Sequence, residues 1–359
     1  MHQRDEIESE TISVSIGRHK IGPNHPAFVV AEAGVNHDGV LDNALHLIDS
    51  AVEAGVDAVK FQMFQARELA TAAAPKASYQ VRDRGGESQL DMLSGLELSE
   101  EAFAAIKKHC DEQGVVFLAT PFGPADVTRL ASLQVAALKI ASTDLTNEPL
   151  LDAASQTGLP LILSTGASTE DEIRRCVGAR AQQGALDRLI LMHCVSAYPT
   201  PLDAINLRAI ATLRQAFRVP CGLSDHTTSV ETGAWAVAAG ACIVEKHLTY
   251  DRHAAGPDHA MSLEPLQFGE YVARIRLVER SMGDGRLGMS SLEAEVREVA
   301  RKSVVSAKSI SIGTVLTDAM LTCKRPGTGI LPVDLHRLVG RRTTVDIPCD
   351  TVLSWDMVR

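Results

Sequence analysis

Hydrophobic residues in this chain come in short runs that alternate with amphipathic stretches. Eight apolar runs of about strand length follow one another, at 28–34, 58–63, 116–122, 137–142, 161–166, 189–194, 221–226 and 242–248. Stretches with helical periodicity fall between them, such as 43–54 and 100–113, the latter followed by Gly114 in a capping position. Continuous apolar strands that alternate with helices indicate a parallel sheet covered by helices.

Eight strand–helix units within roughly 250 residues predict a closed (β/α)8 barrel, the TIM-barrel fold. An open, doubly wound sheet is the alternative, but no GxGxxG motif follows the first apolar run. Ahead of the barrel, residues 11–21 alternate between apolar and polar and turn at Gly17, which predicts an N-terminal β-hairpin.

The C-terminal part of the chain has a different pattern. After Gly285 the strand–helix alternation stops, and residues 290–302 are charged with helical periodicity. Short β runs and turns follow to the end of the sequence. We therefore expect a barrel domain with its hairpin at 1–285, a linker helix at 286–302 and a small β-rich domain at 303–359 with a modest core.

The last two apolar runs of the barrel each end in a histidine. The stretch between them is about as long as a crossover helix, so the two runs form a βαβ unit with parallel strands. Ser224 and His226 then share one face, as do Glu245 and His247, because side chains alternate along a strand. A single histidine in such a place is more often a hydrogen-bonded core residue. Two neutral imidazoles at neighbouring strand ends, with open positions left over, suit a catalytic divalent metal.

Most of the apolar runs end in polar residues, and in barrels the chemistry lies at the carboxyl ends of the strands. Lys60 and Lys139 stand inside apolar runs, where a buried ammonium group is costly unless it meets an anion. Two lysines directed at one barrel mouth predict an anionic substrate. Ser142, Asp144 and Ser164 are also open to a simpler interpretation, as caps of the following helices.

The connection between the second strand and the third helix, residues 64–98, is unusually long and contains Arg82 and Arg84. Connections of this length in a compact domain are typically lids or binding loops. We therefore expect a lid or binding loop here, although any one of its charges can equally be a solvated surface group.

Composition limits the partners of the chain. The net charge is −10 and aromatic residues make up 4% of the sequence, which argues against a nucleic-acid partner. The acidic N-terminus is unlike a signal peptide and no apolar run reaches membrane-spanning length, so we expect no membrane partner. Seven cysteines are scattered without CxxC spacing, which predicts free thiols in a reducing cytoplasm.

A series of short motifs runs through the chain. In order, the motifs are Val30-Ala-Glu-Ala-Gly-Val-Asn-His37, Val59-Lys-Phe-Gln62, Ala74-Pro-Lys-Ala-Ser-Tyr-Gln80, Thr120-Pro-Phe122, Lys139-Ile-Ala-Ser142, Ser164-Thr-Gly166, Tyr198-Pro-Thr-Pro201, Gly222-Leu-Ser-Asp-His-Thr227, Glu245-Lys-His-Leu-Thr249, Gly256-Pro-Asp258 and Lys324-Arg-Pro-Gly327. From about residue 13 to the C-terminus, and in this order, the chain resembles the bacterial N-acetylneuraminate (sialic acid) synthase family. The resemblance is specific to the family and much less specific to the substrate.

The resemblance implies a C–C bond-forming transferase. Phosphoenolpyruvate condenses with an open-chain N-acylated hexosamine aldehyde, either N-acetylmannosamine or a diacetamido-dideoxy hexose, to give a nonulosonic (sialic-type) acid and phosphate. The resemblance also implies a divalent metal, commonly Mn²⁺ with Mg²⁺ or Co²⁺ as alternatives. It further implies a domain-swapped homodimer in which a small antifreeze-like (SAF) domain covers the partner's barrel.

Residue by residue, the resemblance implies roles at matching positions. Glu32 matches the carboxylate near the reacting carbons, and with Lys60 and Lys139 forms the implied catalytic set. His226 and His247 match the metal ligands. Contacts to phosphoenolpyruvate are implied for Lys60, Thr120, Lys139, Ser142, Ser164 and Ser224. Contacts to the sugar are implied for Tyr198, for Asp258 and for Arg325, the last supplied by the partner subunit's tail.

Departures from the family pattern concern the acceptor. Asp144 stands where many members have Glu, Ser196 where Asn or Thr is common, and Met63 where Thr is usual. These positions line or support the sugar side, and legionaminic acid-type synthases share other features of this chain, so the acceptor need not be N-acetylmannosamine. Two other hypotheses remain open: a metal-dependent barrel lyase or hydrolase whose histidines hold a water-activating metal, and a non-catalytic carbohydrate-binding protein.

Overall fold

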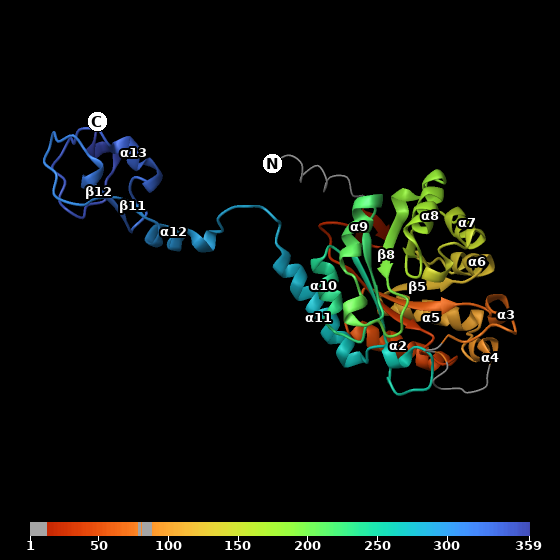
Figure 1. Ribbon diagram of the computed structural model, residues 1–359. Coiled ribbons are helices and arrows are strands. Elements are labelled where there is room, and N and C mark those ends of the chain that lie inside the picture. Colours follow the sequence, from red (N-terminus) through yellow and green to blue (C-terminus); the bar gives the residue numbers. More distant parts are fainter. Residues whose placement is uncertain (1–12, 78–79, 81–87) are drawn as a thin grey trace. The chain divides into compact units, whose positions relative to one another are not determined.

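The computed structural model describes residues 13–77, 80 and 88–359 (Figure 1). The chain divides into two compact units, the first ending at Gly283 and the second running Asp284–Arg359. Arg82 and Arg84 of the long connection, and the first residues of the expected hairpin, lie outside the described residues.

The first unit is a closed barrel of parallel strands, which confirms the TIM-barrel prediction. Around the barrel the strands follow the order β10-β3-β4-β5-β6-β7-β8-β9. Their bounds are β3 (Phe28–Gly34), β4 (Ala58–Met63), β5 (Val116–Pro121), β6 (Leu138–Ile140), β7 (Leu161–Ser164), β8 (Leu189–Cys194), β9 (Cys221–Asp225) and β10 (Ile243–His247). Each strand therefore lies within one of the apolar runs, so the runs themselves specify the barrel wall.

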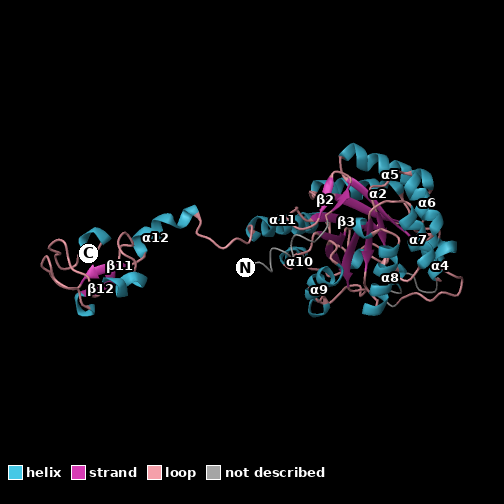
Figure 2. Cartoon of the chain, turned by 90° about the horizontal axis from the view of Figure 1, so that it is seen from above, coloured by secondary structure: helices cyan, strands magenta, loops and turns pink. Residues whose placement is uncertain are grey.

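Helices form the outer layer of the barrel (Figure 2). They are α2 (Leu41–Glu53), α5 (Glu100–Gln113), α6 (Pro124–Ser132), α7 (Glu148–Gln156), α8 (Glu170–Gln182), α9 (Arg208–Phe217), α10 (Thr232–Ala238) and α11 (Pro265–Met282). Gly114 ends α5 in the left-handed conformation, with a φ of 73°, as expected for a glycine cap. Short 3₁₀ segments occur at η2 (Ser142–Asp144), η3 (Leu186–Arg188), η4 (Leu202–Ala204) and η5 (His259–Met261).

The N-terminal hairpin, β1 (Val14–Ile16) paired antiparallel with β2 (His19–Ile21), contributes to the barrel core. Val14, Ile16 and Ile21 are buried in one cluster with inward-facing strand residues such as Phe28 and Ile243. These residues come from the amino-terminal halves of their strands. The hairpin therefore packs against the amino-terminal end of the barrel, and the carboxyl end is left for the polar residues.

The long connection after β4 is partly helical, which corrects the expectation of a single loop. It contains α3 (Ala66–Leu69) and α4 (Gln89–Ser94), and the Ser88 side chain caps α4 by accepting from Asp91 N. Met92 and Leu96 pack with Val35 and Phe64 in a small apolar cluster separate from the barrel core. This cluster anchors the described part of the connection beside the β3–α2 turn.

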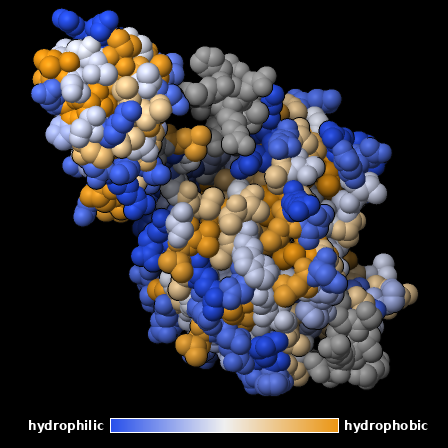
Figure 3. Space-filling view, turned by 60° about the vertical axis from the view of Figure 1, so that its left-hand side comes forward, coloured by the Kyte–Doolittle hydropathy of each residue, from blue (hydrophilic) through white to orange (hydrophobic). Residues whose placement is uncertain are grey.

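The second unit has a core of its own, formed by residues that include Val304, Ile310, Leu316, Ile347 and Leu353. Its elements are η6 (Ser291–Glu293), α12 (Ala294–Ala300), β11 (Ser303–Ser306), η7 (Asp318–Met320), β12 (Leu321–Lys324), η8 (Pro332–Asp334), α13 (Leu335–Leu338) and η9 (Trp355–Met357). Within 286–302, the expected linker helix, the structure has the short segments η6 and α12, and both belong to this second unit. Polar and apolar side chains are interspersed on the visible surface (Figure 3). Among the described residues, no helix is both long and apolar enough to cross a bilayer.

Candidate active site

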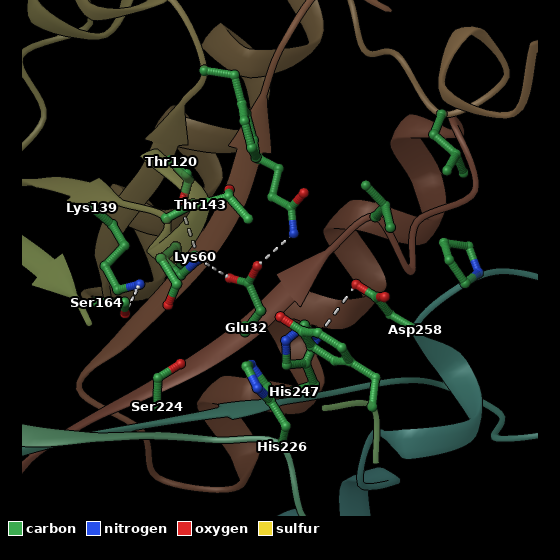
Figure 4. A pocket seen from close by; sticks show the side chains of 18 of the residues that line it. Glu32, Lys60, Thr120, Lys139, Thr143, Ser164, Ser224, His226, His247 and Asp258 are labelled. Carbon is green, nitrogen blue, oxygen red and sulfur yellow. Dashed lines mark hydrogen bonds and ion pairs between the residues drawn. The ribbon is translucent and has the colours of Figure 1, made fainter. Parts of the chain in front are cut away.

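A cavity of about 360 Å³ opens among the carboxyl ends of the barrel strands. Eleven of the predicted site residues line it: Glu32, Lys60, Thr120, Lys139, Ser142, Ser164, Tyr198, Ser224, His226, His247 and Asp258. They come from the carboxyl ends of the barrel strands and from the connections that follow them, such as η2 for Ser142 and the segment after β10 for Asp258. Residues far apart in the sequence therefore converge on the mouth of the barrel (Figure 4).

Four buried charges form the floor of the cavity. Lys60 Nζ lies 2.6 Å from Glu32 Oε2 and donates a hydrogen bond to Thr120 Oγ1 at 3.0 Å. Lys139 Nζ donates to Ser164 Oγ at 2.7 Å. Glu245 joins the two lysines, with its carboxylate oxygens 3.8 Å from Lys60 Nζ and 3.5 Å from Lys139 Nζ. Two ammonium groups and two carboxylates therefore balance one another in the interior.

The two carboxylates of this cluster differ in their proton affinity. Burial raises the pKa of Glu32, and the opposing attraction of Lys60 does not cancel it. For Glu245 burial acts in the same direction, but Lys139 and Lys60 outweigh it, so its pKa is lowered. When the environments of two carboxylates shift their pKa values in opposite directions, one group is often suited to proton transfer while the other stays ionised. Glu32 is therefore the better candidate for acid–base chemistry.

The two lysines also differ. Burial alone lowers the pKa of Lys60, but the carboxylates of Glu245 and Glu32 more than compensate and raise it. Burial is the dominant effect on Lys139, and its pKa is lowered. Lys60 is thus held as a cation by its protein neighbours, whereas an anionic ligand next to Lys139 would favour its charged form.

His226 and His247 lie side by side, with ring centroids 5.4 Å apart. His226 Nδ1 lies 2.9 Å from the Val195 carbonyl oxygen, so Nδ1 carries a proton and Nε2 has a free lone pair when the ring is neutral. Burial lowers the pKa of His226, but Cys194 and the Val195 carbonyl outweigh burial and raise it, and a cation bound at Nε2 would favour the neutral ring. Burial lowers the pKa of His247 well below its ordinary value, which keeps this ring neutral. His247 Nδ1 is buried with no hydrogen-bond partner among the described residues, and its nearest acid is Asp258, 3.6 Å away.

This donor set fits a divalent metal. Neutral imidazoles, one of them held in a fixed tautomer by a carbonyl, are the usual nitrogen ligands of such ions. In the described part of the chain no group of three or more His, Cys, Asp and Glu side chains is arranged to hold a metal. The pair alone leaves further coordination positions, as in catalytic rather than structural sites.

Tyr198 and Asp258 lie on the side of the cavity near the histidines. The Tyr198 ring stacks against His226 with a centroid distance of 4.3 Å. Burial, together with the nearby Glu32, raises the pKa of Asp258 to about 6. In Figure 4, Lys139, Lys60, Glu32 and Asp258 succeed one another across the view. An anion at the lysines and a second ligand near Asp258 would therefore meet at Glu32.

Two predicted site residues are not in the cavity wall. Asp144 is half-buried in η2 and accepts a hydrogen bond from Asn147 Nδ2 at 2.9 Å, while its neighbour Thr143 lines the cavity. Arg325 belongs to the second unit, where it is exposed in the segment after β12.

Several lining residues were missed by the sequence reasoning. The foremost is Glu245, which contacts both lysines and accepts from Ser224 Oγ at 3.0 Å. Its position two residues before His247 on an apolar strand is the same signal that identified the lysines. Gln62 was missed as well and donates to Glu32 Oε1 at 3.0 Å. The connection after β4 also reaches the cavity, through residues that include Leu69, Gln80, Gln89, Met92, Leu93 and Leu96.

Comparison with known proteins agrees with this geometry. The sequence pattern of the NeuB family matches residues 47–287, and that of the SAF domain matches 301–359. The chain is 37% identical to the N,N'-diacetyllegionaminic acid synthase of Legionella pneumophila over 94% of this chain and 96% of that protein. It is 32% identical to the human N-acetylneuraminate-9-phosphate synthase, over 94% of each chain.

A solved structure gives the same result. The crystal structure of the N-acetylneuraminic acid (sialic acid) synthetase from Leptospira borgpetersenii, in complex with citrate, matches with a TM-score of 0.72 and 35% identity. The match covers 80% of this chain and 95% of that one. The family resemblance is thereby confirmed: the chain belongs to the NeuB family and ends in a SAF domain.

Proposed function

We propose that this protein condenses phosphoenolpyruvate with the open-chain aldehyde of an N-acylated hexosamine, giving a nonulosonic acid and inorganic phosphate. The observation that carries the proposal is the convergence of Lys60 and Lys139, Glu32 and the His226–His247 pair in one cavity. The names of the relatives support the same reaction class. A hydrolase would need the metal ligands. A reaction that joins phosphoenolpyruvate to a second carbon substrate would also use the cavity residues from Lys139 to Asp258.

In this reaction the lysines and hydroxyls hold phosphoenolpyruvate. Lys139 with Ser164, and Lys60 with Thr120, are already hydrogen-bonded as pairs, so each ammonium group is oriented before the anion arrives. We assign Ser142 and Ser224 to the same ligand. Charge-assisted contacts of this kind fix the enol ester with its C3 directed at the acceptor, and holding both reactants supplies much of the rate.

Glu32 is the proposed acid–base group. As C3 of phosphoenolpyruvate forms a bond to the aldehyde carbon, positive charge develops at C2, and the Glu32 carboxylate can stabilise it. Water then adds to C2 and gives up a proton, for which Glu32, with its raised pKa, is a suitable acceptor. The former aldehyde oxygen takes up a proton and becomes a hydroxyl. Cleavage of the bond between C2 and the phosphate oxygen, with loss of the proton of the new C2 hydroxyl, releases phosphate and leaves the 2-keto acid.

His226 and His247 would hold a divalent metal, and Mn²⁺ is our first choice, with Mg²⁺ or Co²⁺ as alternatives. When bound, such an ion supplies Lewis-acid polarisation of the aldehyde oxygen. We assign Tyr198 and Asp258 to the sugar, since both lie beside the histidines. Asp144, through its contact with Asn147, would act on the sugar only indirectly.

We also propose a homodimer in which Arg325 of the partner subunit's SAF domain reaches the acyl group of the sugar. The exposure of Arg325 supports this assignment. A cytoplasmic location is part of the proposal, because all seven cysteines are free thiols.

The test is phosphate release from phosphoenolpyruvate with a panel of N-acetylmannosamine, mannose and diacetamido-dideoxy hexoses. We expect release only with an N-acylated sugar, its loss in EDTA and its recovery on addition of Mn²⁺. Release that is metal-dependent but equally fast without any sugar would instead support a hydrolase. The preferred sugar in the panel identifies the acceptor.

A further inference from the structure

A second group of charged residues lies on the opposite, outward side of β9 and β10. Lys246 and Asp225 are neighbours in register across the two strands, and both side chains are 0% exposed. Lys246 Nζ donates to Asp225 Oδ2 at 2.8 Å. Most outward positions of the other strands, such as Val59 and Leu163, are apolar and pack against the helices. An ion pair between two barrel strands is therefore an exception among these outward strand positions.

Stability does not account for such a pair. Removing two charges from water costs about as much as their attraction returns, and apolar residues of similar volume usually do as well or better. A buried pair is better explained by what it positions. Here it directly precedes the two histidines in the sequence, since Asp225 is followed by His226 and Lys246 by His247.

The pair fixes the backbone on both sides of His226. Asp225 Oδ1 accepts from Thr227 N at 2.9 Å, which closes a tight turn around the histidine. Lys246 Nζ donates to the Thr227 carbonyl oxygen at 2.5 Å and to its Oγ1 at 3.1 Å. One lysine of β10, adjacent to His247, is thus bonded to the residues before and after His226.

The outer helices hold this pair in turn. Tyr271 of α11 directs its hydroxyl to Asp225 Oδ2 at 3.3 Å, and Thr232 of α10 donates to the same oxygen. Gly233 makes room for the tyrosine, because a Cβ there would lie 2.4 Å from its ring. Both oxygens of the carboxylate are therefore hydrogen-bonded, Oδ1 to the turn after β9 and Oδ2 to α10, α11 and Lys246.

We propose that Asp225 and Lys246 are positioning residues for metal binding: they set the relative placement of the two imidazoles so that both can ligate one divalent cation. This inference rests on the metal site of the proposed function. Residues on the outward side of β9 and β10 would then contribute to metal binding without lining the cavity.

The experiment compares Mn²⁺ binding by full-length variants, with free Mn²⁺ followed by its electron paramagnetic resonance signal. The double variant Asp225→Asn/Lys246→Met removes both charges and leaves no lone buried ion. We expect Mn²⁺ affinity to fall by about 10-fold or more, as for other residues that orient metal ligands. The Kd for phosphoenolpyruvate in EDTA, measured by calorimetry, should stay within about twofold of the wild-type value, because Lys60 and Lys139 are unchanged.

Arg180→Met is the matched control. The Arg180 side chain is 1% exposed and pairs with Glu148 and Asp152 between α7 and α8, so the variant also removes a buried charge from the outer layer. It should lower stability but leave Mn²⁺ affinity unchanged. An equal loss of affinity in Arg180→Met would overturn the inference, because it would show that any weakening of the barrel has the same effect.

Mn²⁺ affinity equal to wild type in the folded double variant would also overturn it. If the double variant does not fold, the variant Tyr271→Phe/Thr232→Val is measured instead. Its Mn²⁺ affinity should fall about threefold, which corresponds to part of the net free energy of a hydrogen bond. Unchanged Mn²⁺ affinity in this variant contradicts the inference. Failure of the wild-type chain to bind Mn²⁺, Mg²⁺ or Co²⁺ is a different outcome, since it removes the proposed metal site itself and this inference with it.

Discussion

Glu245 contacts both cavity lysines from a single strand and so sets the distance between them. The four-charge cluster is neutral as a whole when both lysines and both carboxylates are ionised. An entering phosphoenolpyruvate therefore competes with Glu32 and Glu245 for the ammonium groups. At the scale of single residues, the account predicts that each lysine acts mainly on the anionic substrate.

Replacing Lys139 by Met tests this directly. The change removes a charge-assisted contact of about 1.5–3 kcal/mol, so the KM for phosphoenolpyruvate should rise about 10- to 100-fold. The KM for the sugar should change little, because Lys60 and Glu32 lie between Lys139 and Asp258 in the view of Figure 4. Steady-state kinetics with each substrate varied in turn gives both values. Lys20→Met, at an exposed position of β2, is the control and should match the wild type. Equal effects on both substrates would contradict the assignment.

His37 makes the stability of the barrel depend on pH. Burial lowers the pKa of His37 from 6.5 to about 4. As the pH falls below 6.5, the unfolded chain binds a proton that the folded protein does not, so the free energy of unfolding decreases. From pH 7 to pH 5 the loss due to this residue is about 2 kcal/mol. Urea denaturation of the wild type and of His37→Gln at both pH values measures it. A decrease of the same size in both proteins would show that His37 is not the cause.

At the scale of elements, the strands are the part of the fold that the sequence predicts best. Every second residue faces the barrel axis, which is why Lys60, Lys139 and both histidines could be assigned to one rim from the sequence. The same alternation placed Glu245 inward, but no role was given to it. Asp225 and Lys246 face outward, and their pairing depends on the register of two strands, which local pattern does not specify.

The connections were less predictable than the strands. The helices α3 and α4 within residues 64–98 are short, and their burial depends on tertiary contacts with Val35 and Phe64. Asp144 was placed at the sugar side by resemblance, whereas its contact with Asn147 is a local hydrogen bond at the start of α7. Helix capping and ligand binding call for the same residue types, so the sequence alone does not separate them.

Two glycines of the first unit allow a test of the wall itself. A Cβ at Gly222 would lie 2.0 Å from the Ile243 carbonyl oxygen, so Gly222→Ala must push β9 and β10 apart. We expect a loss of about 3 kcal/mol or more. Gly269→Ala, in α11 with nothing within 4 Å of the new Cβ, should instead stabilise the protein. The gain should be about 0.5–1 kcal/mol.

Chemical denaturation compares the two variants with the wild type. Gly222 and its register partner Ile243 lie on the strands that lead to His226 and His247. Gly222→Ala should therefore also weaken metal binding, whereas Gly269→Ala should not. Equal stability of the two variants would contradict the packing of β9 against β10 described above.

At the scale of the whole molecule, the barrel and the SAF domain have separate cores. Deleting residues 284–359 should therefore leave a folded barrel, with its circular dichroism spectrum and thermal transition retained. Turnover should nevertheless be lost, because the proposed Arg325 contact to the sugar is removed. Arg325→Ala alone should reduce turnover and raise the KM for the sugar. Full activity in the truncated chain would show that the SAF domain contributes no residue to the site.

The fate of the carbon atoms of phosphoenolpyruvate tests the central claim most directly. The protein is incubated with uniformly ¹³C-labelled phosphoenolpyruvate, Mn²⁺ and the best acceptor of the panel, and the products are analysed by mass spectrometry. The account predicts one sugar acid that contains all the labelled carbons together with the intact acceptor, and an equal amount of phosphate. Labelled pyruvate and phosphate beside an unchanged sugar would contradict it.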